Sequence, residues 1–141
     1  MTFLVDANVI MYAAVPSRHR DACLEILEAI ARGEADGRLS TAILEEVWHL
    51  ELSGRAGALD GLARQTYLAF TPLLPVNDQI IARALDLEAR RIGANDRIHV
   101  ATALAHDIDT IVSADADFDG VPAIRRVDPL SDLERSRLLR S

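Results

Sequence analysis

The sequence predicts one α/β domain of three layers, in which helices cover both faces of a small, mostly parallel central sheet. Short apolar runs alternate with segments of helical periodicity, a pattern typical of parallel sheets buried on both sides. The chain has 141 residues, 50% of them hydrophobic, which suffices for one core and is short for two domains. No repeat or low-complexity linker marks a boundary, so residues 1–141 are expected to form a single unit.

The first half of the chain begins with an apolar run over residues 2–5, which Asp6 ends and which predicts a buried strand. Asn8 is a good N-cap for the helix expected next. The elements expected after it are a helix over 18–32, a short strand over 38–40, helices over 41–52 and 56–69, and a strand over 72–76. The last of these is weak because it contains two prolines.

The second half continues the alternation. The expected elements are a helix over 78–92, a helix from 95 or 96 to 105, and strands over 110–113 and 123–126. Asp78 is expected to cap the first of these helices and Gly93 to end it. Residues 130–139 predict a loosely attached terminal helix, so that about 130–141 is peripheral.

The net charge of −7 argues against a general nucleic-acid coat, which needs a broad basic face. It does not exclude an enzyme that handles nucleic acid through metal ions, because bound cations reverse the local field. The single cysteine, Cys23, fits a reducing cytoplasm. No signal peptide and no apolar run of membrane-spanning length is apparent, so a cytoplasmic location without a membrane association is expected.

Four acids stand where the expected elements would bring them to one edge of the sheet. Asp6 follows the first strand, Asp115 follows the strand over 110–113, Glu46 lies on the helix after the second strand, and Asp96 begins a helix. Ligands of open α/β sheets collect at the carboxyl ends of the strands. Each acid alone also has an ordinary explanation, such as a helix cap at Asp96 or a solvated side chain at Glu46. Together they predict a cation site whose carboxylates suit Mg²⁺ or Mn²⁺ better than Zn²⁺.

Four segments resemble the signature blocks of PIN-domain ribonucleases, in the order and at the spacing of that family. They are VDANV (5–9), LSTAILEEV (39–47), NDRIHVATAL (95–104) and IVSADADFDGV (111–121). The resemblance extends from residue 2 to about 129 and is greatest to VapC-type toxins. It implies a metal-dependent RNA phosphodiesterase that uses Mg²⁺, with Mn²⁺ as the alternative. The catalytic and metal-binding quartet that it implies is Asp6, Glu46, Asp96 and Asp115.

Supporting residues follow from the same resemblance. Asn8, Ser113 and Asp117 match positions that support the site, and Glu46 rather than Glu45 matches the family's acid. His99 shares a helix face with Asp96 and is expected either to touch a carboxylate or substrate or to be a structural histidine. The positively charged residues Arg97, Arg125 and Arg126 are expected to be solvated or to contact phosphates.

The resemblance also implies partners. These are an RNA substrate, with tRNA or ribosomal RNA as the expectation, a cognate antitoxin protein that inhibits the toxin, and a second copy of the chain in a homodimer. The antitoxin groove is expected near Trp48 and residues 55–69. Two alternatives are a PIN-like module that binds without catalysis and a Mg²⁺-dependent phosphatase, for which Asn8 and the absence of lysine are unfavourable.

Overall fold

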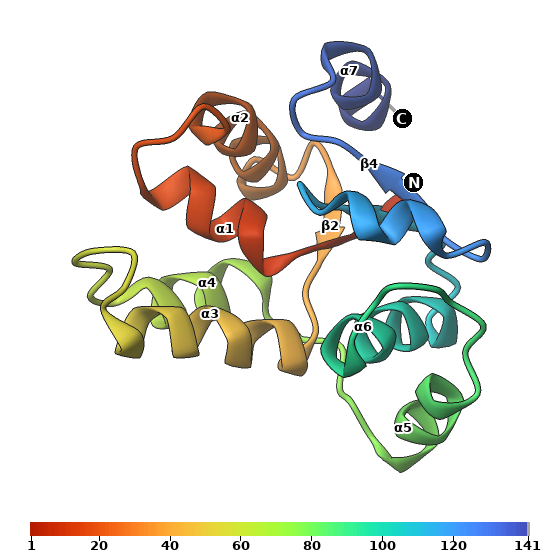
Figure 1. Ribbon diagram of the computed structural model, residues 1–141. Coiled ribbons are helices and arrows are strands. Elements are labelled where there is room, and N and C mark those ends of the chain that lie inside the picture. Colours follow the sequence, from red (N-terminus) through yellow and green to blue (C-terminus); the bar gives the residue numbers. More distant parts are fainter. Residues whose placement is uncertain (141) are drawn as a thin grey trace.

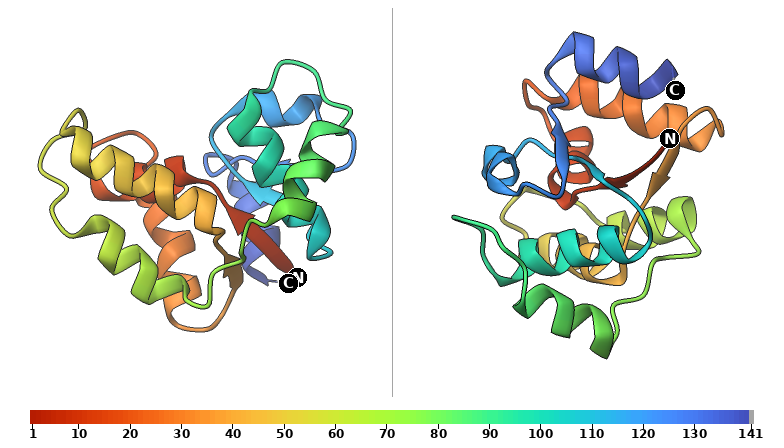
Figure 2. Two further views of the ribbon diagram at one scale, coloured as in Figure 1. Left: turned by 90° about the horizontal axis from the view of Figure 1, so that it is seen from below. Right: turned by 90° about the vertical axis from the view of Figure 1, so that its right-hand side faces the viewer.

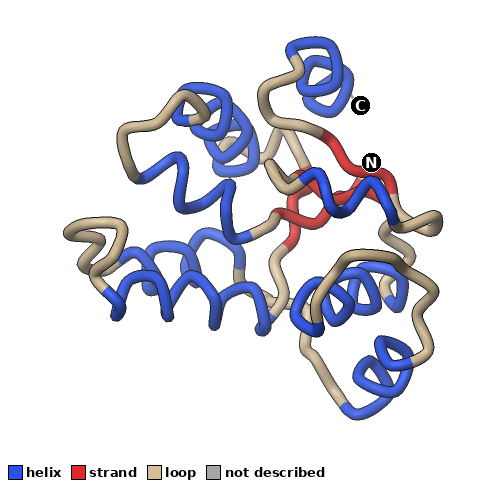
Figure 3. Tube along the Cα trace, in the orientation of Figure 1, coloured by secondary structure: helices blue, strands red, loops and turns tan. Residues whose placement is uncertain are grey.

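A four-stranded parallel sheet forms the centre of the computed structural model, which describes residues 1–140 (Figures 1 and 3). The strands lie in the order β2-β1-β3-β4. Their bounds are β1 (Thr2–Val5), β2 (Asp36–Arg38), β3 (Thr110–Val112) and β4 (Arg125–Val127). All three pairings are parallel, and Val5 is in register with Val112. The carboxyl ends of the two inner strands therefore lie side by side, which confirms the predicted sheet.

Helices cover both faces of this sheet. They are α1 (Ala7–Ala14), α2 (Arg20–Ala31), α3 (Thr41–Ser53), α4 (Leu62–Phe70), α5 (Asp78–Leu85), α6 (Ala94–Ala105), the short 3₁₀ helix η1 (Ala116–Gly120) and α7 (Asp132–Arg140). In the right-hand view of Figure 2, α2 and α7 lie on one side of the strands and α3 to α6 on the other. This arrangement confirms the three-layer α/β fold. None of the helices within residues 1–140 has the length and apolar composition needed to cross a bilayer.

Aliphatic side chains fill the core, as the scarcity of aromatic residues requires. Phe3, Leu4 and Val5 of β1 are fully buried, because helices cover both faces of this inner strand. The terminal helix α7 is also attached to the body of the protein: Leu138 is 2% exposed, and the Arg135 guanidinium donates to Glu25 of α2 at 2.8 Å.

The caps of three helices differ from the sequence prediction. Asp6, and not Asn8, caps α1, because its carboxylate accepts the amide of the next residue and Asn8 lies inside the helix. Asn77 caps α5 through a bond to the Ile80 amide, so Asp78 is the first helical residue. Gly93 precedes α6, which places Asp96 in the first turn of that helix.

Two helices are shorter than predicted. Residues 56–61 are not helical, because Gly57 and Gly61 adopt positive φ angles of 97° and 86°. The helix that begins at 78 ends at Leu85 instead of 92. The strand predicted over 72–76 is reduced to one bridge between Leu74 and Ser40, and β2 and β4 are displaced by one or two residues from their predicted positions.

Candidate metal centre

Asp6 lies at the carboxyl end of β1 and is 5% exposed. One carboxylate oxygen accepts the Ala7 amide at 2.8 Å. The other accepts the Ser113 hydroxyl at 2.7 Å and the Asn8 side-chain amide at 3.1 Å. Burial raises the pKa of Asp6 above its ordinary value, although these hydrogen bonds favour the charged form. The carboxylate is therefore held rigidly in a place where its charge is poorly solvated, and a cation would stabilise it.

Ser113 and Asn8 link the segments that follow β1 and β3. The buried Ser113 hydroxyl accepts the Asn8 side-chain amide at 3.1 Å and the Asp115 backbone amide at 3.0 Å, while it donates to Asp6. The side-chain oxygen of Asn8 accepts the Ala114 amide at 3.2 Å. These bonds restrict the rotamer of Asp6 and the path of the backbone that carries Asp115.

Glu46 on α3 and His99 on α6 meet beside Asp6. Glu46 Oε1 lies 2.8 Å from Nε2 of His99, whose ring is 1% exposed. One ligand atom from each of Asp6, Glu46 and His99 lies within 4.8 Å of the other two. Burial alone would lower the pKa of His99, but the hydrogen bond and the negative charge of Glu46 outweigh it and raise this pKa.

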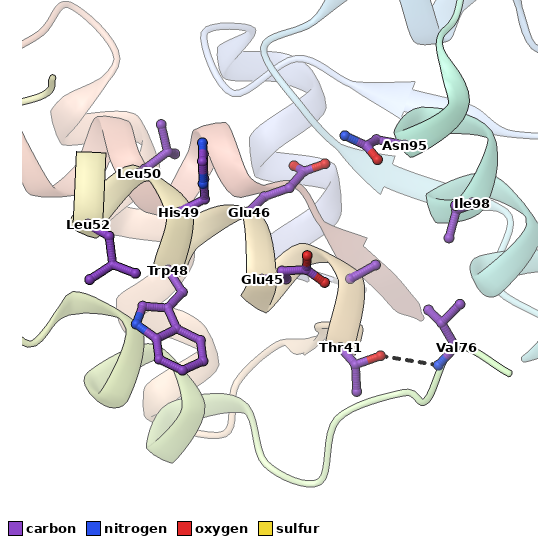
Figure 4. A pocket seen from close by; sticks show the side chains of 11 residues that line it. Thr41, Glu45, Glu46, Trp48, His49, Leu50, Leu52, Val76, Asn95 and Ile98 are labelled. Carbon is purple, nitrogen blue, oxygen red and sulfur yellow. Dashed lines mark hydrogen bonds between the residues drawn. The ribbon is translucent and has the colours of Figure 1, made fainter. Parts of the chain in front are cut away.

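The neighbouring acid Glu45 takes a different direction. Its side chain is exposed and lies nearer to Thr41, whereas the Glu46 carboxylate points toward Asn95 at the start of α6 (Figure 4). Because Val47 is 1% exposed and anchors the buried side of α3, the helix brings Glu46 to Asp6 and leaves Glu45 in solvent.

Asp96 shares the electrostatic environment of this cluster. Burial, and then repulsion from Asp6, raise the pKa of Asp96 to about 6. The charges of Asp115 and Glu46 act in the same direction, and that of His99 opposes them. The other three acids of the predicted quartet are therefore close enough to influence Asp96, which a bound cation would stabilise in its charged form.

Asp115 lies at the start of η1, where its carboxylate accepts the Asp117 amide at 2.9 Å. Asp117 itself is exposed and contributes this backbone amide. Within residues 1–140, the one group of three metal-ligating side chains with ligand atoms this close is Asp6, Glu46 and His99; Asp96 and Asp115 lie outside it. The sequence indicated His99 only as a supporting residue of the site. The one signal for its place in the site was its position three residues after Asp96, on the same face of the helix.

Two of the arginines that were expected to be solvated or to contact phosphates instead make hydrogen bonds within the protein. Arg97 donates to three backbone carbonyls of the segment between α5 and α6, at 2.8 to 3.3 Å. Arg126 donates to both carboxylate oxygens of Asp119 and to the Ser113 carbonyl. Arg125 is exposed and its guanidinium lies 3.8 Å from the Met1 sulfur. Arg97 and Arg126 therefore stabilise loops that adjoin the acidic cluster.

A groove of about 780 Å³ begins at this cluster and follows α3 (Figure 4). Its walls combine acidic, polar and apolar side chains, among them Glu45, Glu46, Trp48, Leu52, Val76 and Asn95. Trp48 is 55% exposed and also lines a second groove of about 280 Å³, shared with Arg64 and Tyr67 of α4. The acidic end and the exposed tryptophan make the first groove suited to a segment with basic and apolar groups.

The donor set of the cluster fits a divalent cation. Carboxylate oxygens are the ligands that Mg²⁺ and Mn²⁺ prefer. Repulsion among acids at these distances also favours the binding of a positive charge, as the raised pKa of Asp96 indicates. The arrangement can therefore hold a cation at the carboxyl ends of β1 and β3, with one side open to the groove.

Comparison with known proteins identifies the family of the chain. The family model described as PIN domain matches residues 3–124. Two similar proteins are the VapC ribonuclease Mb1869c of Mycobacterium bovis and Ribonuclease VapC13 of Mycobacterium tuberculosis. Each is 27% identical over 128 residues, which cover 88% of this chain and 98% of the relative.

Two solved structures share the fold. VapBC2 from Rickettsia felis, bound to a DNA fragment from its promoter, gives a TM-score of 0.68 at 19% identity and covers 89% of this chain and 97% of that one. FitAcB from Neisseria gonorrhoeae gives a TM-score of 0.62 at 20% identity and covers 92% of this chain and 99% of that one.

Proposed function

The chain belongs to the PIN-domain family, and from this premise we propose that it is a metal-dependent endoribonuclease that acts as the toxin of a toxin–antitoxin pair. The meeting of the Asp6 and Glu46 carboxylates within 4.8 Å, beside the buried His99 that bonds Glu46, is the observation that carries the proposal. The relatives named as VapC ribonucleases, which align over 98% of their length, support it.

The proposed catalytic and metal-binding residues are Asp6, Glu46, Asp96 and Asp115. A bound Mg²⁺ or Mn²⁺ would polarise the RNA phosphate and lower the pKa of a water molecule. All four are proposed to take part in holding the metal, with Asp6, Asp96 and Asp115 as the main ligands. Glu46 is proposed to help with a second ion or to orient the attacking water. Asn8 and Ser113 keep Asp6 in one rotamer through the bonds described above.

The proposed inhibitor is a cognate antitoxin that occupies the groove along α3. A basic side chain of the antitoxin would reach Glu46, and apolar side chains would contact Trp48 and Leu52, which are 55% and 72% exposed. Replacing Trp48 by Ala is expected to weaken the complex. The matched control is the Leu133→Ala variant, which changes an exposed residue of α7. Unchanged affinity of the Trp48→Ala variant would place the antitoxin elsewhere.

Several finer properties complete the proposal. The substrate is proposed to be a tRNA or a ribosomal RNA, and the protein to act in the cytoplasm as a homodimer of one-domain subunits. The exposure of Leu52, Leu68 and Leu85, at 72%, 67% and 80%, supports contacts with other chains. Analytical ultracentrifugation of the purified protein tests the dimer.

Cleavage of RNA tests the central proposal. Total RNA and a tRNA pool are incubated with antitoxin-free protein in Mg²⁺ or Mn²⁺ and in EDTA, beside the Asp6→Asn variant. Discrete, metal-dependent products that the variant does not form are expected. Equal products from both proteins, or undiminished cleavage in EDTA, would refute the assignment. Turnover of small phosphate monoesters without RNA cleavage would indicate a phosphatase, and neither activity would indicate a binding module.

A further inference from the structure

We propose that His99 is a positioning residue that holds the Glu46 carboxylate in the metal centre. The inference rests on the proposed function and assigns a role to a buried histidine that the four-acid site does not require. Its basis is the 2.8 Å contact between His99 Nε2 and Glu46 Oε1, which joins α6 to α3 across the cluster.

The hydrogen-bond chemistry distinguishes positioning from metal ligation. An ionised carboxylate only accepts hydrogen bonds, so the proton in this contact belongs to Nε2 of His99. A protonated Nε2 has no lone pair to offer a cation. The other ring nitrogen, Nδ1, is buried and has no hydrogen-bond partner among residues 1–140. His99 therefore acts on the centre through Glu46 in this arrangement.

Glu46 needs such a partner. Its side chain is 30% exposed at the edge of the groove, where water competes for it. The Asp6 carboxylate lies within 4.8 Å and repels it toward solvent. Competition from water and repulsion from Asp6 would together move a flexible glutamate away from Asp6. The hydrogen bond to the rigid, buried ring of His99 opposes both effects.

A buried histidine with one unpartnered nitrogen is also a poor core residue. A buried polar atom without a hydrogen bond destabilises a fold, and an apolar side chain of similar size does not carry this penalty. A purely structural role would thus be filled better by leucine. We expect the His99→Leu variant to be at least as resistant to heat as the native protein when both are free of metal, and yet to bind metal less well.

Calorimetric titration with Mn²⁺ alone tests the proposal on the full chain. His99→Leu is expected to weaken binding by roughly 10- to 100-fold, as loss of a residue that orients a ligand typically does. His99→Gln can still donate to Glu46 and is expected to recover most of the affinity. In a Glu46→Gln background the same His99→Leu change should have an effect of less than about threefold, because the residue it acts through is gone. His106→Leu, at an exposed histidine just after α6, is the control.

A crystal structure of metal-free His99→Gln and His99→Leu proteins supplies a readout that needs neither RNA nor metal. Glu46 is expected to remain beside Asp6 in the first variant and to turn into the groove in the second. Native affinity of His99→Leu, an equal loss in the Glu46→Gln background, or an unmoved Glu46 would overturn the proposal. Failure of the native protein to bind Mn²⁺ would instead refute the metal-dependent function, while the position of Glu46 would still decide the role of His99.

Discussion

Replacing Asp6 by Asn removes a buried negative charge and preserves the shape of the side chain. The amide oxygen of Asn can still accept the Ala7 amide and cap α1, because Asn is as good an N-cap as Asp. The amino group of Asn would face Ser113 and Asn8, which both donate to the native carboxylate. The substitution therefore has two opposing effects on stability. It removes two hydrogen bonds, which destabilises the fold, and it removes a charge that burial disfavours, which stabilises it.

The sizes of these two effects are similar. Two donors without their acceptor cost about 1–3 kcal/mol each. Repulsion between Asp6 and Glu46, whose ligand atoms lie within 4.8 Å, amounts to about 3.5 kcal/mol at an effective dielectric constant of 20. The free energy of unfolding without metal should thus change by no more than about 2.5 kcal/mol. Metal at one hundred times its Kd adds about 2.7 kcal/mol to the native protein by mass action, or roughly 10 °C in Tm.

Thermal unfolding of both proteins in EDTA and in excess Mn²⁺ measures these quantities. The native protein should gain about 10 °C from Mn²⁺, and the Asp6→Asn variant almost nothing. An equal gain in both proteins would show that the ion binds without Asp6. A loss of more than about 4 kcal/mol in EDTA would show that Asp6 is needed chiefly for folding.

Three further predictions follow from the geometry. In EDTA, the free energy of unfolding should fall as pH rises from about 4 to 6. The reason is that native Asp96 keeps its proton up to a pKa of about 6, whereas the unfolded chain releases it near 3.8. Urea titrations measure this, and a rise with pH would contradict the placement of Asp96. Glu46→Gln should lower the initial rate of RNA cleavage at least about tenfold and Glu45→Gln should leave it nearly unchanged; the reverse result would mean that Glu45 is the functional acid. Arg97→Ala should lower the free energy of unfolding, measured by urea titration, by about 2–4 kcal/mol, because three carbonyls lose a charged donor. Replacing the exposed Arg83 by Ala is the control. Equal effects of the two substitutions would show that the bonds of Arg97 contribute little.

The alternation of apolar runs and helical segments determined the fold class, because a strand without polar positions must be covered on both faces. The same pattern predicted the acids at strand ends: Asp6 directly follows β1, and Asp115 follows β3 by three residues. Parallel inner strands bring such positions together whatever the details of the helices.

Helix ends were less predictable, because they depend on contacts between distant segments. Helix α5 ends at Leu85, and carbonyls of the segment that follows it accept hydrogen bonds from Arg97, a residue of the next helix. The cap of α1 is Asp6 because the strand that precedes it leaves the carboxylate beside the first free amide.

The pairing of Glu46 with His99 was decided by tertiary structure alone. The two residues are 53 positions apart, and no local pattern specifies that α3 and α6 pack so that these side chains meet in front of Asp6. The sequence by itself predicted which acids form a cation site. The packing of α3 and α6 around β1 decided which of them face one another, because only there do burial, repulsion and a single hydrogen bond act on the same few atoms.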